Sequence, residues 1–168
     1  MIEQRRLSRI IVPTFAAMAG TLFLLGLLSG LALASSGDLF VSPGGSGDCS
    51  QPSPCDLHTA LTLASDGDTV YVAQGTYTGT GAAVITVTES ITVYGGWDGT
   101  MTVPPVRDPK INPTTLDGKG LRRVVYITGT ITPTLEGLWL TNGSSGSRGG
   151  GIAVDGAHPI ISGCWIFG

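Results

Sequence analysis

The stretches Leu135-Glu136-Gly137-Leu138-Trp139 and Ile161-Ser162-Gly163-Cys164-Trp165 share one pattern: an apolar residue, a glycine and a tryptophan at alternate positions. They lie 26 residues apart, and a proline precedes each at the same interval, Pro133 and Pro159. A third copy, Val93-Tyr94-Gly95-Gly96-Trp97, contains the remaining tryptophan. A fixed period of this size is typical of a repeat architecture, in which each unit buries its apolar face against the next.

The segments around these copies predict short β-strands. Thr69–Ala73, Val84–Val87 and Val124–Thr128 are rich in valine, isoleucine and threonine, which suit a pleated and partly buried surface. Strands of three to five residues that recur about every 26 residues fit a coil better than a sheet of hairpins. The sequence therefore predicts an all-β solenoid with parallel coils stacked about 4.8 Å apart.

The register of the last two copies predicts which side chains lie over one another. Gly137 and Gly163 fall at a bend, where a side chain would clash. Cys164 falls in an inner row, so we interpret it as a small buried apolar group and not as a reactive thiol. The predicted inner pairs are Leu135 with Ile161, Leu138 with Cys164, and Leu140 with Ile166.

A short helix is predicted ahead of the coils. Asp56 is a good helix cap, and Leu57, Ala60, Leu61 and Ala64 follow at the spacing of one apolar stripe. We expect this helix to cover the open end of the coil, because an uncapped solenoid exposes apolar core and unpaired strand edges.

Cys49 and Cys55 flank a polar stretch, Ser50 to Pro54, which we interpret as a loop. In an oxidising compartment the two cysteines are expected to form a disulfide. The alternatives are two free thiols or half of a metal site, for which no neighbouring pair of ligands stands in the sequence.

The N-terminus has the form of an export signal. Arg5, Arg6 and Arg9 precede an uncharged stretch from Ile10 to Ala34 that ends in small residues. We therefore assign residues 1–34 as a signal peptide, with an uncleaved membrane anchor as the alternative. The remaining segments are 35–67, a cap with the short helix and the disulfide loop, and 68–168, the coils, which we expect to be truncated at the C-terminus.

Charge limits the class of partner. The whole chain has nine basic and twelve acidic residues, and three basic and one acidic of these lie in the predicted signal. Six basic and eleven acidic residues remain, a formal charge of −5, which argues against nucleic acid and anionic lipid surfaces. Contact with a membrane is expected only through the N-terminal segment, if it is not cleaved.

Two segments interrupt the strand pattern. Asp98–Asn112 contains three prolines, and we predict that it is a loop extruded from the repeat. Asn142–Gly151 is nearly all glycine and serine and is predicted to be a second loop. It lacks the ending of a phosphate loop, so nucleotide binding is excluded.

At this level the sequence resembles a known family. Phe40–Gly45, the capping helix and Gly67–Tyr77 resemble the N-terminal cap of bacterial right-handed parallel β-helix proteins, the pectate-lyase-like superfold. Gly149–Ile152 and Pro159–Ile166 resemble their internal repeat. The resemblance covers nearly everything after Asp38 and implies a right-handed parallel β-helix. It says little of function, because this superfold hosts lyases, hydrolases, epimerases and adhesins.

The chain departs from the enzymes of that superfold. Lyases place clustered acidic calcium ligands and a basic catalytic residue on one face, and galacturonan hydrolases need paired aspartates on neighbouring coils. Neither pattern is present in this sequence, so no catalytic, metal or cofactor residue is assigned. The one calcium alternative is Asp66 with Asp68, where a turn and helix stop is the preferred interpretation.

The candidate binding residues are Trp139 and Trp165, which should point outward because their neighbours on both sides point inward. Stacked one coil apart, they would form an aromatic strip suited to the apolar faces of sugar rings. The alternative is that a loop such as Asn142–Gly151 covers them. Trp97 differs, because Gly96 replaces the inner leucine and the indole is expected to turn inward.

The remaining polar candidates have simpler explanations. Arg122 and Arg123 could bind an acidic polysaccharide, but a solvated strand entrance is the preferred interpretation. His58 and His158 have no nucleophile or carboxylate partner in register, so catalysis is not expected of either.

The sequence thus favours an exported, cell-surface β-helix module that is not an enzyme and that presents a rigid face to polysaccharide or to another surface. The alternative is the leading part of a polysaccharide lyase or glycoside hydrolase whose catalytic coils lie beyond residue 168. A purely structural spacer is a third interpretation.

Overall fold

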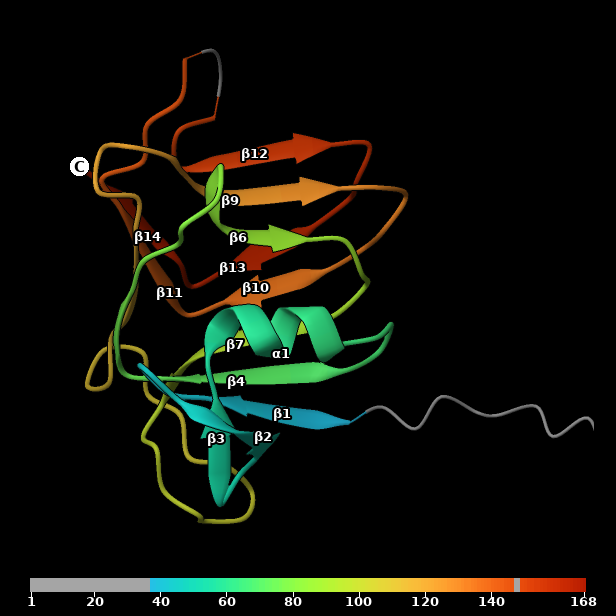
Figure 1. The fold of residues 1–168 in the computed structure, drawn as a ribbon, viewed down its shortest axis with the longest axis vertical. Coiled ribbons are helices and arrows are strands. Elements are labelled where there is room, and N and C mark those ends of the chain that lie inside the picture. Colours follow the sequence, from blue (N-terminus) through green and yellow to red (C-terminus); the bar gives the residue numbers. More distant parts are fainter. Residues whose placement is uncertain (1–36, 147–148) are drawn as a thin grey trace, which may run out of the picture. The chain divides into compact units, whose positions relative to one another are not determined.

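The computed structural model describes residues 37–146 and 149–168 (Figure 1). The predicted signal peptide, residues 1–34, lies outside the described residues. Within the described ranges, no helix is both long and apolar enough to cross a membrane.

Parallel strands form three sheets, here called A, B and C (Figure 1). Sheet A contains β1 (Asp38–Val41), β4 (Thr69–Ala73), β7 (Thr92–Trp97), β10 (Thr134–Glu136) and β13 (Ile160–Ser162). Sheet B contains β5 (Gly75–Tyr77), β8 (Thr114–Asp117), β11 (Leu138–Thr141) and β14 (Trp165–Phe167). Sheet C contains β6 (Ala83–Val87), β9 (Arg123–Thr128) and β12 (Ile152–Asp155).

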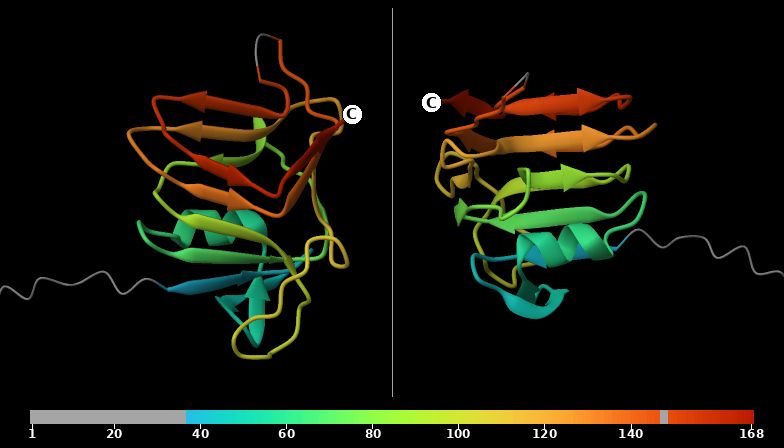
Figure 2. Two further views of the ribbon diagram at one scale, coloured as in Figure 1. Left: turned by 180° about the vertical axis from the view of Figure 1, so that it is seen from behind. Right: turned by 45° about the horizontal axis from the view of Figure 1, so that its top comes forward.

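The chain visits the sheets in a fixed order. From β4 it passes to β5 and β6, and it then returns to sheet A as β7, which pairs in parallel with β4. The next turn runs through β7, β8 and β9, and the one after it through β10, β11 and β12, so that successive coils lie one above another (Figure 2). The predicted solenoid of parallel coils is confirmed.

The predicted register is also confirmed. Leu135 lies opposite Ile161 in sheet A, and Leu140 lies opposite Ile166 in sheet B. Because Trp139 pairs with Trp165, the preceding residues Leu138 and Cys164 also fall at equivalent positions. Between the last two coils the spacing is 26 residues in sheets A and B but 27 in sheet C, where Val125 pairs with Ile152.

These rows form the core. Leu135, Leu138 and Leu140 are at most 1% exposed, and equivalent apolar residues of the earlier coils continue the same cluster toward the helix. Apolar burial contributes about 25 cal/mol per Å², so each fully buried leucine contributes roughly 2 kcal/mol.

A glycine is required at the bend between sheets A and B. Gly137 has φ of +71°, a conformation that disfavours L side chains. A Cβ there would lie 2.5 Å from Cγ of Pro109. Gly163 repeats the positive φ at +55°, as the alignment of the two copies predicts.

The capping helix α1 spans Leu57–Leu63. The Asp56 carboxylate accepts hydrogen bonds from the backbone N–H of His58 and Thr59 at 2.9 and 3.0 Å and so caps the helix. Leu57 and Ala60 are buried in the core cluster, and α1 contacts β1, β4 and β6. The predicted cap is therefore present at this end of the coils.

The stretch Ser50 to Pro54, predicted to be a loop, instead contributes to an antiparallel hairpin of β2 (Ser46–Ser50) and β3 (Ser53–Cys55). The two prolines of this stretch have low strand propensity, so the sequence gives no sign of the hairpin. A disulfide joins Cys49 to Cys55, and β3 pairs with β1 through Cys55 and Val41. The cross-link and this pairing hold a polar segment in strand form.

We predict that Leu138→Ala lowers the free energy of unfolding by about 3 kcal/mol, because it leaves a cavity in a closely packed row. Urea denaturation measures the change. The matched control is Leu121→Ala. Because Leu121 is 75% exposed, this substitution should lower the free energy of unfolding by less than about 0.5 kcal/mol. Equal costs at the two positions would contradict the arrangement of the rows.

We predict that replacing both Cys49 and Cys55 by alanine lowers the free energy of unfolding by about 2 kcal/mol, the chain-entropy value for a cross-link with a sequence separation of 6. Reductant should lower the urea midpoint of the wild type and leave that of the double variant unchanged. An unshifted wild-type midpoint would show that the cross-link does not stabilise the cap.

Candidate functional site

An outer aromatic cluster lies on sheet B and consists of Trp139, Trp165 and Phe167. The indole rings of Trp139 and Trp165 have centroids 5.3 Å apart and are tilted by 41°. Phe167 meets Trp139 edge to face, with centroids 5.9 Å apart. Trp165 is 36% exposed and Phe167 48%, whereas Trp139 is half-buried. Both tryptophans point away from the core, as their alternation with buried neighbours predicts.

The segment Asp98–Asn112, here called the arm, explains the partial burial of Trp139. Its later part pairs antiparallel with the end of β7, with hydrogen bonds from the Asp98 N–H to the Val106 carbonyl and from the Asp108 N–H to the Gly96 carbonyl. Its Pro109 carbonyl accepts a hydrogen bond of 3.1 Å from Nε1 of Trp139. The arm therefore contacts this tryptophan.

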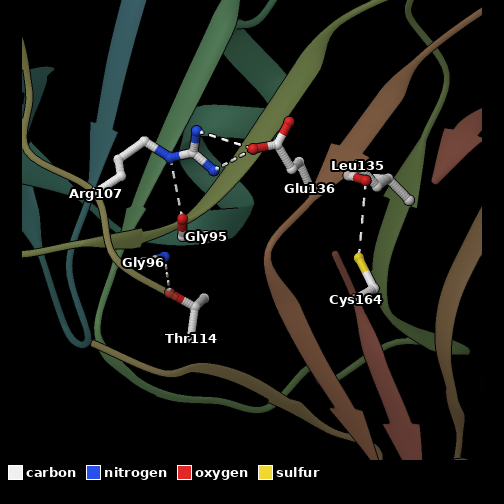
Figure 3. Close-up of polar contacts among 7 residues, drawn as sticks. All are labelled: Gly95, Gly96, Arg107, Thr114, Leu135, Glu136 and Cys164. Carbon is white, nitrogen blue, oxygen red and sulfur yellow. Dashed lines mark hydrogen bonds and ion pairs between the residues drawn. The ribbon is translucent and has the colours of Figure 1, made fainter. Parts of the chain in front are cut away.

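Arg107 attaches the arm to the coil (Figure 3). Its Nε donates to the Gly95 carbonyl at 3.1 Å, and its terminal nitrogens lie 3.3 Å from Oε1 of Glu136. The guanidinium also lies 3.8 Å from the ring centroid of Tyr94, a cation–π contact. The Arg107 side chain is only 17% exposed, so these contacts form in a partly desolvated setting.

An aromatic ladder lies on the outer face of sheet A. Phe40, Tyr71 and Tyr94 occupy successive coils at one register position, with centroids 5.2 and 5.8 Å apart. Trp97 meets Phe40 at a centroid distance of 5.0 Å and is fully buried. The ladder and the arm together bury this corner of the solenoid.

The expectation for Trp97 needs a correction. Its indole is buried, but it packs with Phe40 and Ala73 in a cluster separate from the coil core, so it does not fill the space beside Gly96. The register of β4 and β7 shifts here, so that Trp97 pairs with Ala73, and Nε1 donates to the Thr100 carbonyl. The arm therefore buries Trp97 from outside.

Thr114 fixes the corner at which the arm leaves. Its hydroxyl is fully buried and accepts a hydrogen bond of 2.9 Å from the Gly96 N–H (Figure 3). It also lies 3.0 Å from the carbonyls of Val72 and Ala73. A buried hydroxyl with partners on three sides satisfies backbone groups that the turn would otherwise leave unpaired.

The two aspartates considered for calcium serve the turn. Oδ1 of Asp66 accepts from the Ser90 N–H at 2.6 Å. The Asp68 carboxylate accepts from the Gly37 N–H at 2.7 Å and from the Ser65 N–H at 2.9 Å. Across residues 37–146 and 149–168, no three histidine, cysteine or acidic side chains gather closely enough to hold a metal ion.

The basic and histidine candidates lie apart. Arg123 begins β9, with its guanidinium 5.9 Å from the ring of Tyr126. Arg122 has a buried Nε without a hydrogen-bond partner among the described residues. His58 lies on α1. His158 lies in the turn before β13, where its backbone N–H donates a hydrogen bond to the Ile131 carbonyl. The structure does not bring these side chains together.

Cys164 packs against the core, as predicted, and its Sγ lies 3.7 Å from the Leu135 carbonyl (Figure 3). Burial raises the pKa of its thiol, which lowers the fraction of the nucleophilic thiolate at neutral pH. The geometry therefore gives this cysteine a packing role.

Three residues that contribute to these surfaces were not predicted from the sequence. Phe167 could have been found, since it stands two residues after Trp165 and so faces the same way. Tyr94 shares its register with Tyr71, a signal visible as a tyrosine beside the core valine in both strands. The role of Arg107 has no sequence signal, because it depends on how the arm folds back.

Comparison with protein-family models gives no match, and searches of curated proteins and of solved structures give none either. The arguments about function therefore rest on the geometry described above.

We predict that Arg107→Ala makes the arm several-fold more sensitive to thermolysin, because the variant loses the contacts with Tyr94, Gly95 and Glu136 that hold it. Limited proteolysis followed by mass spectrometry measures the rate of cleavage within 98–112. Lys110→Ala is the control, since Lys110 is exposed on the same arm. Equal cleavage rates in the two variants would show that Arg107 does not hold the arm.

Proposed function

We propose that this protein is an exported, non-catalytic β-solenoid module that binds polysaccharide through its outer aromatic cluster. The observation that carries the proposal is the stacking of Trp139 on Trp165 at 5.3 Å, at paired positions of sheet B. Aromatic rings held one rung apart offer an apolar surface whose spacing is set by the backbone ladder.

Rigidity supports the same proposal. Trp139 is held by its hydrogen bond to Pro109, and the arm that carries Pro109 is itself attached through Arg107. A surface that is already ordered loses little conformational entropy on binding, which favours affinity. The net charge of −5 after residue 34 favours a neutral polysaccharide over an acidic one.

The remaining parts of the proposal come from the sequence. The resemblance to the pectate-lyase-like superfold implies right-handed winding and a bacterial origin, and the basic and apolar N-terminus implies export to the cell surface or beyond. A rigid, regular lateral face suits a module that binds an extended polymer, since equivalent positions recur along the axis.

We predict that the Trp139→Ala, Trp165→Ala double variant loses at least about tenfold in affinity for neutral insoluble polysaccharides such as cellulose or chitin, the equivalent of about 1.4 kcal/mol. Pull-down with the full chain measures the bound fraction. Tyr126→Ala is the control, because Tyr126 is an aromatic residue on β9, in sheet C.

Two results would contradict this function. Equal binding by the wild type and the double variant would remove the aromatic cluster from recognition. Turnover of acidic polysaccharides by this chain, with or without calcium, would instead favour the lyase or hydrolase alternative.

A further inference from the structure

A groove of about 850 Å³ lies between α1 and β6, away from the outer aromatic cluster. This volume falls within the range of about 300–1,000 Å³ that is typical of ligand pockets. One wall is the face of α1 that carries Leu57, His58, Leu61 and Thr62. The opposite wall is β6 and the two residues after it, and the corner Thr76–Ala82 closes one end.

The wall formed by β6 is the edge of a sheet. Sheet C runs in the order β12, β9, β6, so β6 has a strand neighbour on one side only. Sheet A continues past this level to β4 and β1, whereas sheet C ends at β6 and α1 lies across the groove from its edge (Figure 1).

The ladder register tells which backbone groups of β6 are unpaired. The Val125 N–H donates to the Gly151 carbonyl, so the backbone of Val125 faces β12. The backbone N–H and C=O of the next residue, Tyr126, therefore point toward β6. Because Tyr126 lies opposite Thr86 in a parallel ladder, these two groups bond with the flanking residues Ile85 and Val87. It follows that the N–H and C=O of Thr86 point away from β9, toward the groove, and by the same alternation so do those of Thr88.

No strand or side chain among the described residues pairs with these groups of Thr86, and its side chain is exposed. The strand Ala83–Val87 has no charge and no proline, the usual means by which proteins protect a sheet edge. The edge is therefore open to pairing along the groove.

The side chains that line the groove suit an extended chain. Thr76, Thr78 and Thr86 place hydroxyls along it, and Leu61 and the buried ring of Tyr77 supply apolar surface. The unpaired backbone groups recur every second residue, about 6.6 Å apart, which is the repeat of a polypeptide strand.

The charge of the lining limits which kind of segment the groove can bind. The lining contains the carboxylates of Asp56 and Glu89 and, within the described residues, neither lysine nor arginine. A hydrogen bond from the Thr59 hydroxyl lowers the pKa of Asp56, so that carboxylate stays ionised well below neutral pH. A segment with lysine or arginine would complement this lining.

We propose that this groove binds an extended, lysine- or arginine-containing segment of another protein, which adds a strand to sheet C at β6. Its backbone pairs with Thr86 and Thr88, in the mode known as β-strand addition. Small or β-branched side chains meet the threonines, and a basic side chain pairs with Glu89. The inference is independent of polysaccharide binding by the outer aromatic cluster.

The test uses the full chain and a short synthetic peptide that alternates threonine and valine between terminal lysines, with both ends blocked. We expect saturable binding by isothermal titration calorimetry, with a shift of the Thr86 amide resonance in NMR spectra. The same peptide methylated at alternate backbone nitrogens should bind about tenfold more weakly, because it cannot complete the ladder.

Two variants separate backbone pairing from side-chain contact. Thr86→Pro removes the N–H that points into the groove and should weaken binding about tenfold, whereas Thr86→Val keeps the N–H and should bind within about twofold of wild type. Glu89→Gln should weaken binding of the lysine peptide and leave the binding of an uncharged analogue unchanged.

Equal binding of the methylated and unmethylated peptides to the wild type would overturn strand addition, whatever the folding of the proline variant. Absence of peptide binding would overturn it too. So would a neutral cello-oligosaccharide that shifts the Thr86 resonance while the peptide does not, since the groove would then be a glycan site.

Discussion

The stacking of like apolar side chains along parallel rungs is the interaction on which the rest of the structure depends. In sheet A the row passes from Val70 through Val93 to Leu135, and each side chain is buried by the equivalents above and below it. No single coil could bury these residues alone, so the core exists only as a stack. The same register that aligns the interior also aligns the exterior, which is why two tryptophans 26 residues apart become neighbours.

The outer face is shaped by one excursion from the repeat. The arm leaves after Trp97, buries that indole against Phe40, and returns through Arg107 and Pro109 before β8 begins. Its polar contacts are directed to backbone carbonyls and to Glu136, so it is held by the coil and not merely by its own turns. The arm thus joins the sheet A ladder to the aromatic cluster of sheet B and fixes how much of Trp139 remains exposed.

The sequence predicted the parts of the fold that follow from periodicity. The helix after Asp56, the parallel coils, the rows through Leu135 and Leu140 and the glycine bends are all visible as repeated residue types at fixed spacing. The β2–β3 hairpin and the packing of Trp97 against Phe40 were not predictable in this way, because each depends on contacts between segments outside the repeat. The position of Arg107 is a further case, since a single arginine in a proline-rich loop has no periodic partner.

The unequal spacing of the sheets has a consequence for how such a chain can vary. Between the last two coils the spacing is 27 in sheet C and 26 in sheets A and B, so the one-residue difference falls in the turn from sheet C to sheet A. Length differences are therefore absorbed at a corner, where no row is interrupted. A chain built like this can gain or lose whole rungs by duplication or deletion of its coding sequence, and each new rung would inherit an interior that already fits its neighbours.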